Sequence, residues 1–184
     1  LDHEDADVRK AALIALDQIE DSPLERNQVA PFLASDNPEL HETGVWVATH
    51  HPEWSDVVLE FLQDRLRAEA LTEAQQSSAA TVVVSFCKDP GVQQLVADLL
   101  GRSSISAGRK ELLLGTIDEC SVEELPDRWV TQIGNLLRTG QPTVRTQALD
   151  LIESRQVESL ATELEQIAAD EQESLDFRIE ALGA

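Results

Sequence analysis

The chain has 184 residues, of which 42% are hydrophobic and 27% are charged, a composition typical of folded rather than disordered proteins. Acidic side chains number 35 against 14 Lys and Arg, which gives a formal net charge of −21. Such a surface repels phosphate groups, so the composition argues against nucleic-acid binding and against docking on anionic lipid. No apolar run approaches the roughly 20 residues of a membrane-spanning helix, so we expect no membrane insertion.

The acidity itself has two explanations. Solubility, for example in a salty environment, accounts for it without any partner, because net charge acts on solubility and steering before it acts on a specific contact. A basic partner is the alternative.

Helical patterning runs through the chain in pairs, with Pro, Gly, Ser and Asn between them. The expected pairs are 5–19 with 25–34, 38–50 with 54–66, 72–87 with 92–101, 106–119 with 123–138, and 142–154 with 158–169, and a further helix begins at Ser174. Ser121 and Glu124 have the spacing of a capping box, which places a helix start near Glu123. No window alternates apolar and polar residues with a period of two, so we expect no strands.

Internal repeats are indicated by segments 5–16 and 141–152, which both contain Val-Arg followed by Ala three positions after the Arg. The Arg position recurs in six first helices at intervals of 32 to 36 residues, and we call its occupants the slot residues: Arg9, His41, Ser77, Arg109, Arg145 and Arg178. Three positions further on lie Ala12, Gly44, Ala80, Leu112, Ala148 and Ala181, five of them small. Small side chains let helices approach closely, and a lone helix pair cannot bury its apolar faces, so we expect the pairs to stack. We expect the Arg145 guanidinium to cap a helix end or to pair with acidic groups of an adjacent repeat.

A resemblance to HEAT repeats of the short, phycocyanobilin-lyase-like kind rests on Asp5-x-Asp7-Val8-Arg9-x-x-Ala12-x-x-x-Leu16 and Pro142-x-Val144-Arg145-x-x-Ala148-Leu149. It covers essentially the whole chain and is weaker in the third and fourth repeats. The resemblance implies an all-α fold, a right-handed α-solenoid of about five HEAT-like helix pairs plus a partial sixth. It also implies a scaffold or binding role and no reaction.

We expect one repeat array over 1–184, with repeats at about 1–35, 36–70, 71–102, 103–139 and 140–170 and a partial repeat at 171–184. Because the chain contains no Met and opens within a helix signature, we expect it to be an excerpt from a longer protein.

The first third of the chain also resembles the HEAT spacer of large secreted planctomycete proteins, which combine a dehydrogenase-like propeller with a c-type cytochrome module. The resemblance rests on Ala15-Leu16-Asp17-Gln18-Ile19, Val29-Ala30-Pro31-Phe32-Leu33 and His50-His51-Pro52-Glu53-Trp54. This resemblance implies a periplasmic or secreted location. Without it, we expect a cytoplasmic one. The haem-attachment signature is absent, so haem binding is not carried over.

Three histidines, His41, His50 and His51, lie close in sequence, with Glu53 nearby. Converging imidazoles and a carboxylate are metal ligands, but adjacent His50 and His51 at a helix end are expected to point in different directions. We therefore favour a polar turn between helices and assign no metal and no cofactor.

Cys87 and Cys120 lie one repeat apart and have three interpretations: buried thiols, a disulfide, or half of a metal site. Neighbouring helix axes lie about 8–10 Å apart, and a disulfide needs Cα atoms within about 7 Å. The two cysteines are one residue out of step relative to their slot residues, which favours buried thiols.

The sequence gives no basis for catalysis, since it has neither a phosphate-cradling glycine loop nor a Gly-x-Ser-x-Gly elbow. The candidate partner-binding surface is the polar side of the second helices, which we call the second-helix face: Asp56, Glu60, Gln63, Asp64, Gln93, Gln94, Asp98, Asp127, Arg128, Gln132 and Asn135. A plain solvated surface is the alternative. We expect Trp46, Trp54 and Trp129 to fill the core.

These observations favour a non-catalytic scaffold or spacer that contacts a protein, or a neighbouring domain of the parent chain, of basic or polar character. The alternative is a structural segment of a secreted redox enzyme whose catalytic modules lie outside this chain.

Overall fold

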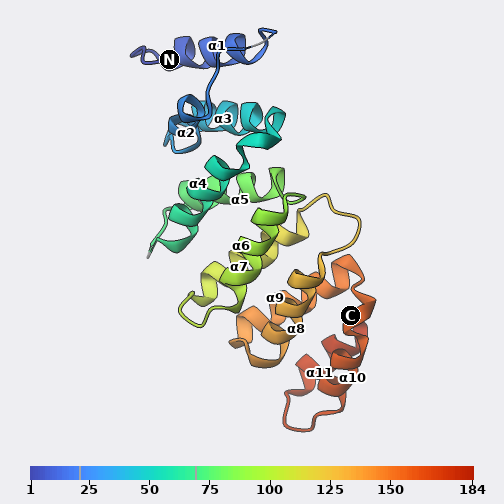
Figure 1. The fold of residues 1–184 in the computed structure, drawn as a ribbon. Coiled ribbons are helices and arrows are strands. Elements are labelled where there is room, and N and C mark those ends of the chain that lie inside the picture. The colour runs from blue at the N-terminus through green and yellow to red at the C-terminus, as the bar shows by residue number, and fades with distance from the viewer. Residues whose placement is uncertain (21, 69) are drawn as a thin grey trace. The chain divides into compact units, whose positions relative to one another are not determined.

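A computed structural model describes residues 1–20, 22–68 and 70–184, and within these ranges the chain forms helices and no strand (Figure 1). The α-helices are α1 (Ala6–Asp17), α2 (Arg26–Leu33), α3 (Pro38–His50), α4 (Ser55–Arg67), α5 (Glu73–Ser85), α6 (Pro90–Gly101), α7 (Ala107–Asp118), α8 (Asp127–Thr139), α9 (Pro142–Arg155), α10 (Ala161–Ala169) and α11 (Leu175–Gly183). Short 3-10 turns, η1 (Pro52–Trp54) and η2 (Glu158–Leu160), lead into α4 and α10. The all-α prediction is confirmed.

Side-chain caps start most of the first helices of the predicted repeats. The capping oxygens belong to Asp5, Asn37, Thr72, Ser106 and Ser174, and each accepts a hydrogen bond from a backbone N–H of the first turn. The exception is α9, which begins with Pro142 at a position where the missing N–H costs nothing. Each cap contributes about 1 kcal/mol and favours a helix start at that residue.

The predicted capping box at Ser121 is wrong, because α8 begins at Asp127, after the non-helical residues 121–126. Pro126 supplies the physical reason. A proline disfavours helical geometry in the residue before it, here Leu125, so a helix cannot start comfortably at Glu123 and continue through this point.

The chain divides into two compact units, residues 1–91 and residues 92–184. In the first, the N-terminal unit, α1, α3 and α5 lie side by side, while α2 packs on α3 and α4, and α4 packs on α5 (Figure 1). The interior is apolar and comprises among others Leu13, Val29, Leu33, Leu40, Val47, Val58, Leu62, Leu66, Val82 and Val83. Each such side chain contributes about 1.5–3 kcal/mol by leaving water.

The second, the C-terminal unit, repeats this plan. Helices α7, α9 and α11 lie side by side, α8 packs on α9 and η2, and α10 packs on α11. Its interior includes Leu99, Leu113, Leu114, Ile117, Trp129, Ile133, Leu137, Ala148, Leu151 and Ile152. Whether the repeats form one array over 1–184 stays a prediction.

The small residue predicted three positions after the slot has a clear role in α3. A Cβ atom added at Gly44 would lie 2.7 Å from Phe32 Cβ and 2.9 Å from the backbone nitrogen of Leu33. The last turn of α2 therefore packs directly on the backbone of α3. Ala148 and Ala181, at the same position in α9 and α11, are buried.

Candidate functional site

Slot residues join the end of one helix to the beginning of the next. His41 Nδ1 donates to the Leu33 carbonyl at 2.8 Å, Arg145 Nε to the Leu137 carbonyl at 2.8 Å, and Arg178 Nε to the Ala168 carbonyl at 2.9 Å. Each acceptor lies in the last turn of the preceding helix. Carbonyls there lack intrahelical partners and carry the negative end of the helix dipole, so a cationic or imidazole donor stabilises that helix end.

Arg145 makes the most extensive set of these contacts. Its two terminal nitrogens bind the two carboxylate oxygens of Glu173 at 3.0 and 2.5 Å, and its guanidinium lies 4.3 Å from the ring centre of Phe177. The expectation that Arg145 caps a helix end and pairs with an acidic group is confirmed, and the acidic group is Glu173, which lies just ahead of α11. That Glu173 belongs to an adjacent repeat stays a prediction.

Two slot residues, Arg9 and Ser77, differ from this pattern. Arg9 Nε is buried and has no hydrogen-bond partner in the part of the chain that the structure describes. Arg109 is buried, and burial lowers the pKa of its guanidinium. Ser77 is exposed and too short to reach a helix end; its neighbour Ser78 instead places its hydroxyl 3.0 Å from His41 Nε2.

The residues of the predicted second-helix face are all exposed or half-exposed. Several of them link neighbouring second helices. Arg26 of α2 forms an ion pair with Asp56 of α4, and Arg128 of α8 donates to Gln94 of α6 at 3.3 Å. Gln94 in turn donates to Asp98 at 2.7 Å. Part of this polar face is therefore used by the protein to hold its own helices in register.

A groove of about 450 Å³ opens on the second-helix face of the N-terminal unit, and we call it the α2–α4 groove. Most of its lining is apolar: Ala30, Ala34, Val57, Phe61, Ala68, Ala70 and Leu71. Glu60, Asp64, Arg65 and Gln75 complete it. Two residues predicted for the face, Glu60 and Asp64, thus border an apolar floor that the sequence pattern did not indicate.

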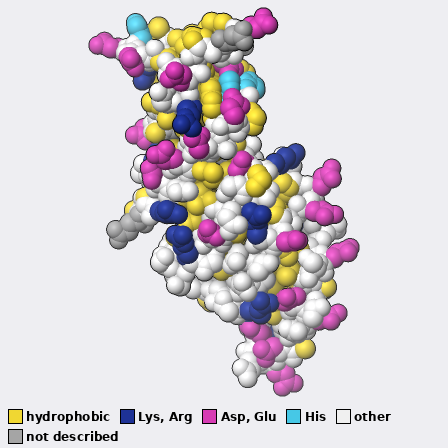
Figure 2. All heavy atoms as spheres, viewed as in Figure 1, with side chains coloured by type: hydrophobic (Ala, Val, Ile, Leu, Met, Phe, Trp, Pro, Cys, Tyr) yellow, Lys and Arg dark blue, Asp and Glu magenta, His cyan; other side chains and the backbone are white. Residues whose placement is uncertain are grey.

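The charges around the groove are unevenly paired. Asp56 has its ion-pair partner in Arg26, whereas Glu60 and Asp64 form no ion pair with any described residue. Arg65 lies over the ring of Phe61, 5.4 Å from its centre. Acidic side chains are also spread over the visible surface generally, with fewer basic ones among them (Figure 2).

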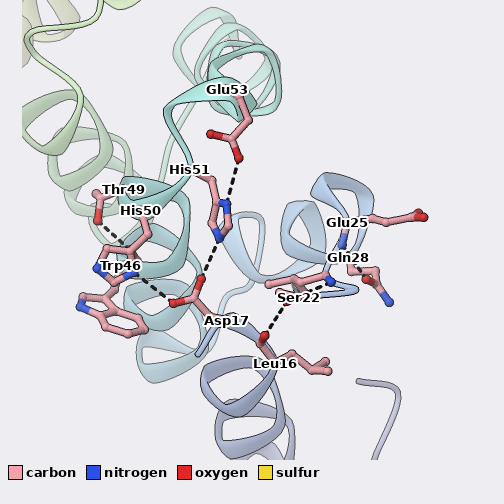
Figure 3. A network of polar contacts seen from close by, with 11 residues as sticks. Leu16, Asp17, Ser22, Glu25, Gln28, Trp46, Thr49, His50, His51 and Glu53 are labelled. Carbon is pink, nitrogen blue, oxygen red and sulfur yellow. Dashed lines mark hydrogen bonds and ion pairs between the residues drawn. The ribbon is translucent and has the colours of Figure 1, made fainter. Parts of the chain in front are cut away.

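A second polar cluster joins α1 to the end of α3, and Figure 3 shows it from close by. Asp17 accepts from His50 Nδ1 at 3.1 Å and from His51 Nε2 at 2.8 Å, and His51 Nδ1 lies 2.9 Å from a carboxylate oxygen of Glu53. The Asp17 side chain is only 5% exposed. The Trp54 ring stacks on the imidazole of His51 at 3.7 Å. We call Asp17, His50, His51 and Glu53 the histidine cluster.

Electrostatics in the histidine cluster favour a charged imidazole. Burial lowers the pKa of His51, but hydrogen bonds to Asp17 and Glu53 and the negative charges of those groups outweigh it, so the pKa is raised. A backbone hydrogen bond within Glu53 and the bond from His51 lower the pKa of the Glu53 carboxyl. Both His51 nitrogens face carboxylates, an arrangement that only the doubly protonated ring satisfies with two donated bonds.

The expectation that His50 and His51 point in different directions is wrong, because both imidazoles reach the same carboxylate (Figure 3). Asp17 lies 33 and 34 residues away from them, and sequence spacing gave no indication of it. His41 lies elsewhere, buried against α2 and α5. No group of three or more His, Cys, Asp and Glu residues suited to a metal ion occurs among residues 1–20, 22–68 and 70–184.

The aromatic and sulfur residues divide between core and surface. Trp129 is fully buried and donates its indole N–H to the Gln93 carbonyl at 2.9 Å, as expected of a core residue. Trp46 contradicts the prediction, since it is 42% exposed and meets the edge of His50 at the surface. Cys87 and Cys120 are both buried, as predicted, and neither is part of a disulfide within the described ranges.

Comparison of the chain with family models, with curated proteins and with solved structures found no match. Across the residues that the structure covers, no helix is both long and apolar enough to cross a membrane.

Proposed function

We propose that this chain is a non-catalytic scaffold of stacked helix pairs, an α-solenoid of the HEAT type, that holds a protein segment or a neighbouring domain on its second-helix face. The observation that carries the proposal is the α2–α4 groove, an apolar hollow on the face that the sequence marks as polar. Concave sites with an apolar lining and a few charged groups are the usual form of binding sites in proteins.

The stacking part of the proposal is supported by the slot contacts. His41, Arg145 and Arg178 make the same kind of bond to the end of the preceding helix. Within each compact unit, first helices lie beside first helices. A chain assembled from such repeated contacts presents the side chains of successive second helices on a common side, which suits an extended partner.

The proposal is tested by selecting binders from a random dodecapeptide library on the full immobilised chain and mapping them by amide hydrogen exchange. We expect peptides that protect backbone amides in α2, α4, α6 or α8. Failure to enrich any peptide, or protection confined to α1, α3, α7 and α9, would contradict the proposed function.

A further inference from the structure

We propose that the α2–α4 groove recognises a single Lys or Arg side chain of a partner protein, flanked by an apolar residue. This inference rests on the proposed function and names the chemistry of its ligand. It begins from the two carboxylates on α4, Glu60 and Asp64, which lie one helical turn apart and so face the same side.

Some acidic side chains of the N-terminal unit are paired with a cationic group, but these two carboxylates are not. Glu39 pairs with Lys10, Asp56 pairs with Arg26, and Asp17 meets two histidines. Glu60 and Asp64 have no such partner in the described chain. Like charges one turn apart repel each other and destabilise a helix. A cation between them removes the repulsion and forms charge-assisted hydrogen bonds.

The apolar floor selects the kind of cation. Lys and Arg carry three or four methylene groups that pack on apolar surface while the charged head remains at the rim. Phe61, Val57 and Ala30 offer such surface directly beside the two carboxylates. A small inorganic cation would gain nothing from this floor, whereas a basic side chain with an apolar neighbour uses both parts of the groove.

Arg65 limits the number of charges that the groove accepts. Its guanidinium already occupies one side of the Phe61 ring and lines the same groove. A second cation from the partner would be repelled by it, since like charges in proximity cost affinity. The geometry therefore favours one basic residue in an apolar context over a polybasic run.

The test uses the peptides selected on the full chain and measures their affinities for two matched double variants. Glu60→Gln with Asp64→Asn removes the two negative charges of the groove, and Asp150→Asn with Glu153→Gln removes two exposed negative charges from α9. We expect the enriched sequences to share one Lys or Arg beside an apolar residue. Their Kd should rise about tenfold or more in the groove variant and stay within about twofold in the α9 variant.

The outcomes separate the inference from the function that it rests on. Peptides that bind the second-helix face but lack a basic residue, or that bind the groove variant as tightly as the parent chain, would overturn the inference and leave the scaffold function intact. A library without any binder would overturn both. Circular dichroism melting curves that match for the two variants show that a weakened Kd reflects lost contacts rather than unfolding.

Discussion

Arg145 shows how one side chain joins three helices, since it extends from α9, caps the end of α8 and lies over the ring of Phe177 in α11. It also pairs with Glu173 just ahead of α11. We expect Arg145→Leu to lower the free energy of unfolding by about 1–3 kcal/mol, because a buried carbonyl and a half-buried carboxylate lose their donor. Arg9→Leu should cost less, because Arg9 Nε has no acceptor among the described residues. Urea unfolding followed by circular dichroism measures both.

Arg67→Leu is the control for this comparison, since Arg67 is exposed at the end of α4. It should change stability by no more than about 0.5 kcal/mol. Equal losses for the Arg9 and Arg145 variants would mean that the bond to the preceding helix contributes nothing measurable.

Gly44 and Gly115 provide a matched pair of helical glycines. Gly44→Ala should destabilise the protein by about 1–3 kcal/mol, because the new methyl group meets the backbone of α2 and forces the two helices apart. Nothing lies within 4 Å of a Cβ atom at Gly115 in α7. Gly115→Ala should therefore stabilise the protein by about 0.5–1 kcal/mol through helix propensity. Melting temperatures that shift in the same direction for both would refute the close-approach argument.

Among the helices, those with strong local signals were predictable and those shaped by tertiary contacts were not. The starts of α3 and α11 follow from Asn37 and Ser174, whose side chains bond to the next turn regardless of the rest of the protein. The start of α8 was mispredicted because Ser121 matched a local pattern while Pro126 overruled it. Local hydrogen bonds are encoded within four residues, which is the range that sequence patterns read well.

The candidate site was likewise predictable from the sequence only where it depends on a single helix. Glu60 and Asp64 were predicted for the second-helix face from the amphipathic pattern of α4. The floor beside them combines α2 with residues near the start of α5, such as Ala30 and Leu71, and this combination depends on how the helices pack. Asp17 was missed for the same reason, because its contacts with His50 and His51 cross from α1 to α3.

The histidine cluster links α1 to α3 in a pH-dependent way. The pKa of His51 is raised in the folded protein, so the protonated ring stabilises the fold. This stabilisation is complete below the pKa of an unfolded histidine, near 6.5, and is lost as pH rises through the higher folded value. We therefore expect the free energy of unfolding to fall as pH increases above about 6.5, measured by urea unfolding at a series of pH values.

Two variants isolate the contribution of His51. His51→Gln should flatten the stability profile in this pH range, whereas His3→Gln, at an exposed residue ahead of α1, should leave it unchanged. The imidazole carbon-bound proton shifts, followed by NMR against pH, report the pKa of His51 directly. A pKa at or below the ordinary value would show that burial outweighs the two carboxylates.

For the molecule as a whole, the net charge of −21 lowers stability through repulsion. Salt should therefore raise stability, whereas it should weaken binding at the groove. Repulsion among unpaired carboxylates destabilises the compact state, and salt screens it over a Debye length of about 10 Å at 0.1 M and about 3 Å at 1 M. The described ion pairs are mostly at least partly exposed and therefore contribute little to stability. Screening them by salt therefore costs little stability. We expect the melting temperature to rise between 0.05 and 0.5 M NaCl.

Binding at the α2–α4 groove should respond to salt in the opposite direction, because screening weakens the attraction between Glu60, Asp64 and a basic ligand. Measuring melting temperature and Kd in the same salt series therefore separates the two roles of acidity. A stabilising effect of salt together with salt-weakened binding fits an acidic surface that provides solubility everywhere and recognition at one place. If salt instead lowered the melting temperature, attractive pairs rather than repulsion would dominate the electrostatics of the fold. If Kd were insensitive to salt, the groove would act through its apolar floor alone.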